Sequence, residues 1–261
     1  MMHPVARLWV NAFNAESLSD LAGGWKEKKL LRLSRTWRKI LRHTRVAPPG
    51  PILEAGCGWG AQMIPLAGRG YRVVGIDCSF PALREGKKII RKLDRDRSLV
   101  GKVEQVCGDF LEESLAGRFQ LVFHRGVLEH YLQLEDRRTF LSAMFARADQ
   151  GGYVISIVPS GIHPRRLQFK ESKLGGYNIP EIDYDPESLR GEAEQCGGGE
   201  VTVIPNNIMG YLNDIPAGKL LRCFRRAVYL FFQAVPNSVW GRKFREQHAY
   251  SFICIARKES G

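Results

Sequence analysis

Three glycines at alternating positions, Gly56, Gly58 and Gly60, follow a short apolar run and precede a predicted helix. Glycine has no Cβ, so such a turn can adopt dihedral angles that other residues avoid, and a ligand can touch the backbone. The free N–H groups at the start of the following helix point at the same place. Asp77 ends the next predicted strand, about 20 residues further on, where a carboxylate can accept hydrogen bonds from a ribose diol. Together these residues predict a binding site for a nucleoside-containing cofactor.

The glycine turn by itself is compatible with two kinds of cofactor. With Ala61 it also satisfies the looser pattern G-x-G-x-x-G/A, which is typical of NAD sites. Three further features favour a different nucleoside. An acid, Glu54, precedes the glycines, and a third predicted strand leads into Gly-Asp109-Phe110, where an acid and an aromatic ring can hold an adenine. A fourth apolar run then leads into Arg-Gly-Val-Leu-Glu-His-Tyr at 125–131.

Taken in order, these motifs resemble those of the class I S-adenosylmethionine-dependent methyltransferases. The resemblance is strongest to the small-molecule methyltransferases that include the ubiquinone and menaquinone biosynthesis enzymes. It runs from about residue 30 to the C-terminus and is most specific over 51–159. It implies that the cofactor is S-adenosyl-L-methionine, that the product is S-adenosyl-L-homocysteine, and that the protein is an enzyme.

The resemblance also implies roles for individual residues. The backbone of the glycine turn and Glu54 would face the methionine part of the cofactor, Asp77 would bind the ribose, and Asp109 would accept from the adenine amino group. Family members often have small residues after the fourth strand, so a His-Arg pair there is a departure. The implied cofactor site comprises Glu54, Gly56, Cys57, Gly58, Gly60, Asp77, Cys78, Ser79, Asp109, Phe110, His124 and Arg125.

Methyl transfer from a sulfonium is a direct displacement, and positioning of the two reactants can supply about 7–11 kcal/mol. An added base is needed only when the acceptor carries its proton at the working pH. Three histidines are candidate catalytic residues: His124, His130 and His163. His124 ends the fourth strand at the ligand-binding edge of the sheet. For His130 a structural hydrogen bond beneath the cofactor is favoured, and His163 lies in a loop after the fifth strand.

Alternating strands and helices, with β-branched strands that are apolar throughout, predict an α/β fold with a parallel sheet. We expect a Rossmann-like, seven-stranded, mostly parallel sheet with helices on both faces. By the resemblance, its last strand is antiparallel. The predicted strands begin near 51, 71, 103, 119, 153, 200 and 250.

The chain divides into two predicted parts. Residues 1–48 form an N-terminal helical arm and cap, and 49–261 form the methyltransferase domain with a helical insertion at about 207–248. Helical spacing of apolar residues covers 26–43. Before it we expect a separate short helix or arm, anchored by Trp9, Phe13 and Trp25.

Composition bounds the remaining possibilities. The 261-residue chain carries a net charge of +12, which bears on partners rather than on the fold. No apolar run is long enough to span a membrane, and the N-terminus lacks the apolar core of a signal peptide. The six cysteines are scattered with no C-x-x-C pair, so no metal site is predicted and a cytoplasmic location is expected.

The insertion contains a helix at about 217–234 with many apolar and aromatic residues and a basic side. Two interpretations are open. The helix packs on the sheet and roofs the acceptor pocket, or it makes a peripheral contact with a membrane, with arginines near the lipid phosphates. We favour the roof, which would bias the pocket toward an apolar or aromatic acceptor.

The predicted function is methyl transfer to a small, apolar or aromatic organic acceptor, at oxygen because oxygen acceptors are frequent in the family. The first alternative is an RNA or protein methyltransferase, which the basic charge favours but the absence of an RNA-binding module disfavours. The second is a non-catalytic cofactor-binding protein that docks on a membrane or partner. The sequence predicts no oligomeric state.

Overall fold

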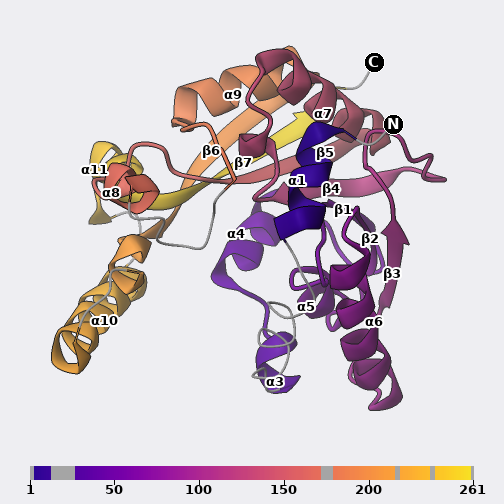
Figure 1. The fold of residues 1–261 in the computed structure, drawn as a ribbon, viewed down its shortest axis with the longest axis horizontal. Coiled ribbons are helices and arrows are strands. Elements are labelled where there is room, and N and C mark those ends of the chain that lie inside the picture. The colour runs from indigo at the N-terminus through magenta and orange to yellow at the C-terminus, as the bar shows by residue number, and fades with distance from the viewer. Residues whose placement is uncertain (1–2, 13–26, 172–178, 215–217, 236–238, 260–261) are drawn as a thin grey trace.

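The computed structural model describes residues 3–12, 27–171, 179–214, 218–235 and 239–259. A seven-stranded sheet in the order β3-β2-β1-β4-β5-β7-β6 forms the centre of the molecule (Figure 1). β7 is antiparallel to both of its neighbours, and the other pairs are parallel. The predicted fold class is confirmed. The strands are β1 Pro51–Ala55, β2 Arg72–Asp77, β3 Lys102–Cys107, β4 Phe119–Arg125, β5 Ala148–Pro159, β6 Gly198–Ile208 and β7 Ala249–Lys258.

Helices cover both faces of the sheet, because each face carries its own apolar cluster. One cluster joins the sheet to Trp37, Met63 and Leu83. The other joins it to Phe140 and Leu189. The helices are α1 Pro4–Ala12, α3 Glu27–Leu30, α4 Arg35–Thr44, α5 Met63–Ala67, α6 Phe80–Arg95, α7 Leu134–Arg147, α8 Arg166–Glu171, α9 Pro186–Gln195, α10 Lys219–Ala234 and α11 Arg242–His248, with short 3-10 helices η1 Leu128–His130 and η2 Gly210–Asn213.

The continuous helical pattern expected over 26–43 is wrong, because the chain forms two helices there, α3 and α4. Ser34 takes an extended conformation, and its side chain accepts a hydrogen bond from the backbone N–H of Trp37. An N-cap of this kind starts a new helix, since it satisfies an N–H group that has no partner within the helix. Trp37 is then fully buried with its ring edge on Phe123.

The helix in the insertion does not roof the cavity along its length, so the favoured interpretation is corrected. α10 extends away from the sheet at the lower left of Figure 1, and none of its residues is buried. Its C-terminal half is tied to the body of the molecule. The Tyr229 hydroxyl donates to Asn207 Oδ1 at 2.9 Å, and Gln233 Nε2 donates to the Ile208 carbonyl at 3.0 Å. Apolar residues at the other end, such as Leu220 and Phe224, face solvent.

Phe13 and Trp25, and the side chain of Trp9, lie outside the described part of the structure. Among the described residues, no helix is both long enough and apolar enough to cross a bilayer.

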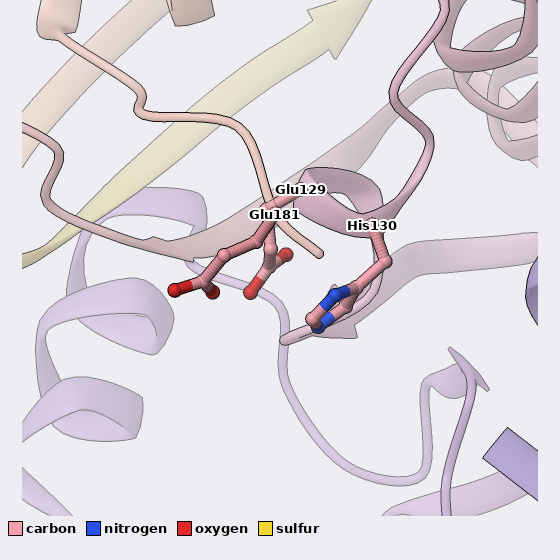
Figure 2. Close-up of side chains that lie close together, drawn as sticks. All are labelled: Glu129, His130 and Glu181. Carbon is pink, nitrogen blue, oxygen red and sulfur yellow. The ribbon is translucent and has the colours of Figure 1, made fainter. Parts of the chain in front are cut away.

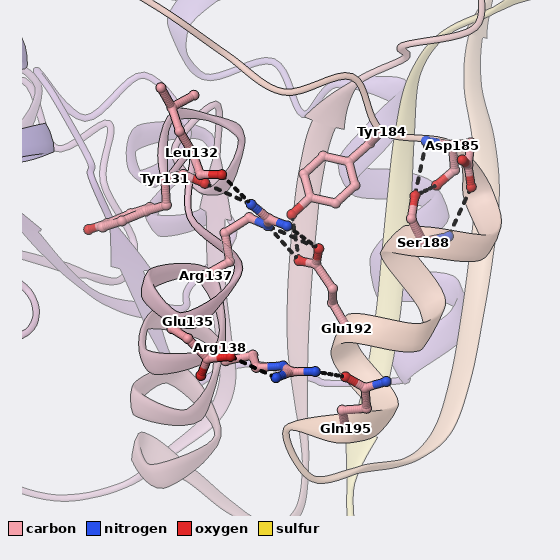
Figure 3. A network of polar contacts seen from close by, with 10 residues as sticks. All are labelled: Tyr131, Leu132, Glu135, Arg137, Arg138, Tyr184, Asp185, Ser188, Glu192 and Gln195. Atoms are coloured by element: carbon pink, nitrogen blue, oxygen red, sulfur yellow. Dashed lines mark hydrogen bonds and ion pairs between the residues drawn. The ribbon is translucent and has the colours of Figure 1, made fainter.

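A buried ion pair joins α7 to α9 and supports the segment that enters the site (Figure 3). Arg137 holds Glu192 with two nitrogens, each at 2.9 Å, and Glu192 also accepts from the Tyr184 hydroxyl at 2.7 Å. The same guanidinium donates to the carbonyls of Tyr131 and Leu132. Loss of the arginine would leave a buried carboxylate without its counter-charge.

We therefore expect Arg137→Leu to lower the free energy of unfolding by about 3 kcal/mol, since removing one partner of a buried pair strands the other. Arg138 is the matched control. It pairs with Glu135 on the exposed side of the same helix, so Arg138→Leu should cost below about 1 kcal/mol. Denaturant titration of both variants measures the difference, and equal losses would contradict the role given to Arg137.

Candidate cofactor and acceptor site

A cavity of about 1100 Å³ opens at the carboxyl ends of β1, β2 and β4. These strands are parallel neighbours, so the segments that follow them meet at one edge of the sheet. Most of the residues that the sequence assigns to the cofactor line this cavity. Those that line it are Glu54, Gly56, Cys57, Gly58, Asp77, Cys78, Asp109, Phe110 and Arg125. Gly60, Ser79 and His124 do not line it.

The glycine turn has the backbone geometry that its sequence predicts. Gly56, Gly58 and Gly60 all have positive φ, at 72°, 53° and 92°. The turn is tied to the end of β2, because the N–H of Gly56 donates to the Ile76 carbonyl at 2.9 Å. A Cβ at Gly58 would meet no atom within 4 Å, so its backbone faces open space in the cavity wall. A ligand can therefore approach this backbone closely.

Asp77 connects the glycine turn to the start of α6. Its Oδ2 accepts from the Gly58 N–H and its Oδ1 accepts from the Ser79 N–H, both at 2.7 Å. Burial raises the pKa of Asp77, and these two hydrogen bonds oppose that rise. Each carboxylate oxygen keeps a second lone pair, so both can still accept from a diol. Ser79 has a structural role here as the N-cap of α6, which explains why it lies outside the cavity lining.

The N-terminal helix α1 closes the end of the cavity near Asp109. The backbone N–H of His3 donates to Asp109 Oδ2 at 2.8 Å, while Leu111 donates to Oδ1 at 3.0 Å. Val5 and Ala6 line the cavity. The sequence predicted an N-terminal arm, but no local signal placed it against the nucleoside end of the site.

Glu54 is buried in the cavity wall, and its Oε2 has no hydrogen-bond partner among the described residues. Burial raises the pKa of Glu54 well above its usual range, although the positive charge of Arg125 opposes the rise. A buried carboxylate without a partner is costly unless a bound group satisfies it. Its chemistry fits a cationic ligand with N–H donors, such as the methionine part of the expected cofactor.

His124 does not reach the cavity, which corrects its assignment to both the cofactor and the chemistry. Its ring is fully buried between the sheet and α7. It lies edge-on to Phe140, with 5.5 Å between the ring centroids. Burial, together with His130, lowers the pKa of His124 to about 3, so the ring is neutral. The reason is the alternation of β4: Phe123 faces the α4 side, and His124 faces α7.

Three ionisable side chains from two distant segments converge on another part of the cavity wall (Figure 2). Glu129 and His130 come from η1, and Glu181 comes from the segment before α9. The Ile182 N–H donates to the Glu129 carbonyl at 2.8 Å, which holds the two segments together. His130 Nδ1 lies 2.9 Å from the Pro180 carbonyl oxygen, a structural hydrogen bond of the kind expected for it.

Sequence reasoning missed Glu129 and Glu181 as site residues. Glu129 lies within a quoted motif, but nothing local shows that it is buried, and Glu181 has no motif. One ligand atom from each of the three residues lies within 4.8 Å of the others, so the cluster has the composition of a cation site. Arg166, however, pairs with Glu181 at 2.7 Å. That guanidinium already supplies the positive charge, so we assign no metal.

The carboxyl of Glu129 is fully buried, and burial raises its pKa from 4.5 to about 8. The folded protein therefore holds this proton up to about pH 8, whereas the unfolded chain releases it near 4.5. Between these values unfolding releases a proton, so raising the pH destabilises the native state. Glu129→Gln cannot ionise and removes this dependence.

We expect the melting temperature of wild type to fall relative to Glu129→Gln as the pH rises from 4.5 to about 8. Calorimetric melts of both proteins across this range test the expectation. The comparison isolates Glu129 because other buried acids, such as Glu54, are present in both proteins. A difference that stays constant with pH would show that Glu129 keeps an ordinary pKa in the native state.

His163 lines the cavity beside the Glu129 cluster, as its position after β5 allows. Its ring stacks on Tyr211 with 5.2 Å between centroids and 9° between planes. Its Nδ1 accepts from the Arg165 N–H at 3.2 Å. Burial, with the nearby charge of Arg166, lowers the pKa of His163 to about 4. The ring is therefore neutral and fixed in orientation.

Comparison with known proteins is consistent with this geometry. Residues 52–152 match the family model described as a methyltransferase domain. The cypemycin N-terminal methyltransferase of a Streptomyces species is 39% identical over 71 residues, which is 27% of this chain and 26% of that protein. A probable fatty acid methyltransferase of Mycobacterium tuberculosis is 23% identical over 166 residues, covering 64% of this chain and 35% of that one. The chain thus spans about a quarter to a third of the length of these two relatives.

A solved structure gives the corresponding likeness in fold. Magnesium protoporphyrin IX methyltransferase from Synechocystis, with S-adenosylhomocysteine bound, superposes with a TM-score of 0.58 at 16% identity. The match covers 98% of this chain and 100% of that chain. At this identity the likeness concerns the fold.

Proposed function

We propose that this chain, a class I S-adenosylmethionine-dependent methyltransferase by its fold and by residues 52–152, transfers a methyl group to a small organic acceptor. Although α10 does not roof the cavity, Val158, Phe169 and Tyr250 line it, so the proposed acceptor is apolar or aromatic in its main part and is methylated at oxygen. The observation that carries the proposal is one continuous cavity with two chemically different ends. The glycine turn and Asp77 line one end, and Glu129 and His163 line the other.

The cofactor is S-adenosyl-L-methionine, which supplies a methyl group bonded to a positively charged sulfur. At the first end, Asp77 would accept from the ribose hydroxyls, and Asp109 would accept at the adenine. Glu54 would face the cationic methionine part, where its unpartnered Oε2 gains a donor. The helix α1 excludes water from the nucleoside, since Val5 and Ala6 complete the wall there.

At the second end, Glu129 is the best-placed proton acceptor. Its Oε2 makes no hydrogen bond to any described residue, and its raised pKa of about 8 makes it a base that works at about pH 8 and above. In the proposed step the acceptor oxygen forms a bond to the methyl carbon, the carbon–sulfur bond breaks, and the hydroxyl proton moves to Glu129. His163 and the Arg166–Glu181 pair form fixed walls that orient the acceptor.

The proposal is tested first by calorimetric titration of the purified protein with S-adenosylmethionine, S-adenosylhomocysteine and NAD. We expect binding of the first two and none of NAD. A screen of phenolic and other hydroxyl acceptors, read by release of S-adenosylhomocysteine, then tests turnover. Folded, cofactor-free protein that binds neither sulfur nucleoside would overturn the proposal.

Variants separate the two ends of the cavity. Glu129→Gln should abolish most turnover on a hydroxyl acceptor while S-adenosylhomocysteine still binds, and wild-type turnover should rise with pH through about 8. His124→Phe is the control, because His124 lies outside the cavity. Binding of both nucleosides without turnover on any acceptor would favour the non-catalytic alternative.

A further inference from the structure

We propose that α10 is a docking surface for a membrane that contains anionic lipids. Three observations carry this inference: an exposed apolar stripe, a basic border without any acid, and the attachment of the helix beside the cavity. The inference goes beyond the methyltransferase activity, and it can be tested without the cofactor or any acceptor.

The apolar stripe runs along the outer side of α10. Leu220, Phe224 and Phe231 are 87%, 66% and 57% exposed. With Ala227 they follow each other at intervals of four, three and four residues, which places them on one face of a helix. Leu230 adjoins this face and is also exposed. In water such a face is costly, so its exposure indicates a contact surface.

The charge of α10 selects the kind of partner. The helix has four basic residues and no acid. By helical spacing Arg225 lies on one side of the apolar stripe and Lys219 and Arg226 on the other, whereas Arg222 lies on the side of Tyr229 and Gln233. α11 adds Lys243 nearby in sequence, whereas Arg242 of α11 is paired with Glu246 at 2.8 Å. Basic side chains that flank an apolar face are typical of helices that lie in the interface of an anionic bilayer.

Other occupants fit these features less well. A second copy of this chain would bring two acid-free basic helices together and would set like charges against each other. A nucleic acid would pair with the arginines but would leave the leucine and phenylalanine side chains exposed. A lipid surface fits both features at once. The apolar face would be buried in the acyl region, and the basic side chains would pair with the lipid phosphates.

The attachment of α10 places this surface next to the cavity. Its inner side is held by Tyr229 and Gln233, and Arg35 of α4 donates to the Gln233 carbonyl at 3.0 Å. Tyr229 and Gln233 also line the cavity. The 16-residue helix is about 24 Å long and projects from the body (Figure 1), so it can lie along a bilayer without covering the sheet. If the proposed function holds, an apolar acceptor dissolved in the membrane would enter from this side.

The test is flotation of the full chain with two kinds of vesicle, phosphatidylcholine alone and phosphatidylcholine mixed with phosphatidylglycerol. We expect binding to the mixed vesicles and little to the neutral ones. The triple variant Leu220→Ser, Phe224→Ser, Phe231→Ser should lose about tenfold or more in vesicle affinity for each side chain that enters the bilayer. Lys219→Gln and Arg226→Gln should each lower the affinity for mixed vesicles by about fivefold.

The matched control is Val100→Ser with Leu132→Ser, since both residues are exposed and apolar but lie outside α10. It should bind vesicles as wild type does. Titration with S-adenosylhomocysteine shows whether each variant still binds this nucleoside. A failure of docking is therefore distinguishable from a failure of the proposed function. The inference is overturned if wild type does not bind the mixed vesicles, or if the triple variant binds them with the same affinity as wild type. It is also overturned if the triple change converts a dimer into a monomer while vesicle binding stays the same.

Discussion

Asp77→Ala is expected to weaken S-adenosylhomocysteine binding by at least about 100-fold, because two charge-assisted hydrogen bonds to a ribose diol are lost together. The structure adds a second reason. Asp77 also fixes the N–H groups of Gly58 and Ser79 at 2.7 Å, so its removal loosens the turn that approaches the cofactor. Calorimetric titration measures the affinity, and a thermal melt establishes that the variant is folded.

The control is Asp94→Ala. It changes the net charge of the chain by the same amount, but Asp94 is exposed and does not line the cavity. It should bind as wild type does. An unchanged affinity in folded Asp77→Ala would remove Asp77 from the site. A loss of affinity in both variants would mean that net charge, and not the ribose contact, controls binding.

Gly58→Leu should bring S-adenosylhomocysteine binding below detection while the protein remains folded. The new side chain has space in the structure, since a Cβ at Gly58 meets nothing within 4 Å. That space belongs to the cavity wall, so the leucine would occupy the position where the cofactor approaches the backbone. The φ of 53° costs a leucine about 1–2 kcal/mol of stability, which a folded domain can tolerate.

Gly117→Leu separates backbone strain from obstruction. Gly117 also has a positive φ, at 86°, and open space around its Cβ position, but it does not line the cavity. Its variant should show a comparable loss of stability and normal binding. If Gly58→Leu binds the cofactor as tightly as Gly117→Leu does, the glycine turn does not contact the ligand. Gly56 would not serve as the control, because a Cβ there would meet Val127 at 2.5 Å.

The sequence alone predicted the fold and most of the residues that line the glycine-turn end of the cavity, but it misplaced His124 and gave no sign that α1 completes the wall there. The glycine turn, Asp77 and Asp109 are local signals: residue types that a short segment needs in order to turn or to accept a hydrogen bond. Strand and helix alternation is equally local, and it predicts that the ends of parallel strands meet. The positive φ values at the three glycines agree with what their spacing indicates.

The end of the cavity that we propose for the acceptor was decided by tertiary structure. Glu129 and Glu181 are far apart in sequence, and their segments are joined by the hydrogen bond of the Ile182 N–H to the Glu129 carbonyl and by that between His130 and the Pro180 carbonyl. His124 was a reasonable candidate by position, yet the depth of its burial depends on α7 packing over β4. Burial then sets the protonation of both groups, raising the pKa of Glu129 and lowering that of His124.

Helices α1 and α10 show the same difference between what the sequence predicts and what the tertiary structure decides. Composition shows that α10 is apolar and basic, and α1 is short and amphipathic, but neither pattern states which surface each helix covers. α1 is held over the end of the cavity near Asp109 by the hydrogen bond of the preceding His3 N–H to Asp109 and by that of Cys78 Sγ to the Ala6 carbonyl. α10 is held through Tyr229 and Gln233 in its C-terminal half. Local propensity and periodicity are properties of a segment, and so the sequence determined the elements and the cofactor turn. Burial and contact depend on what the rest of the chain brings alongside, and only the folded structure decided those.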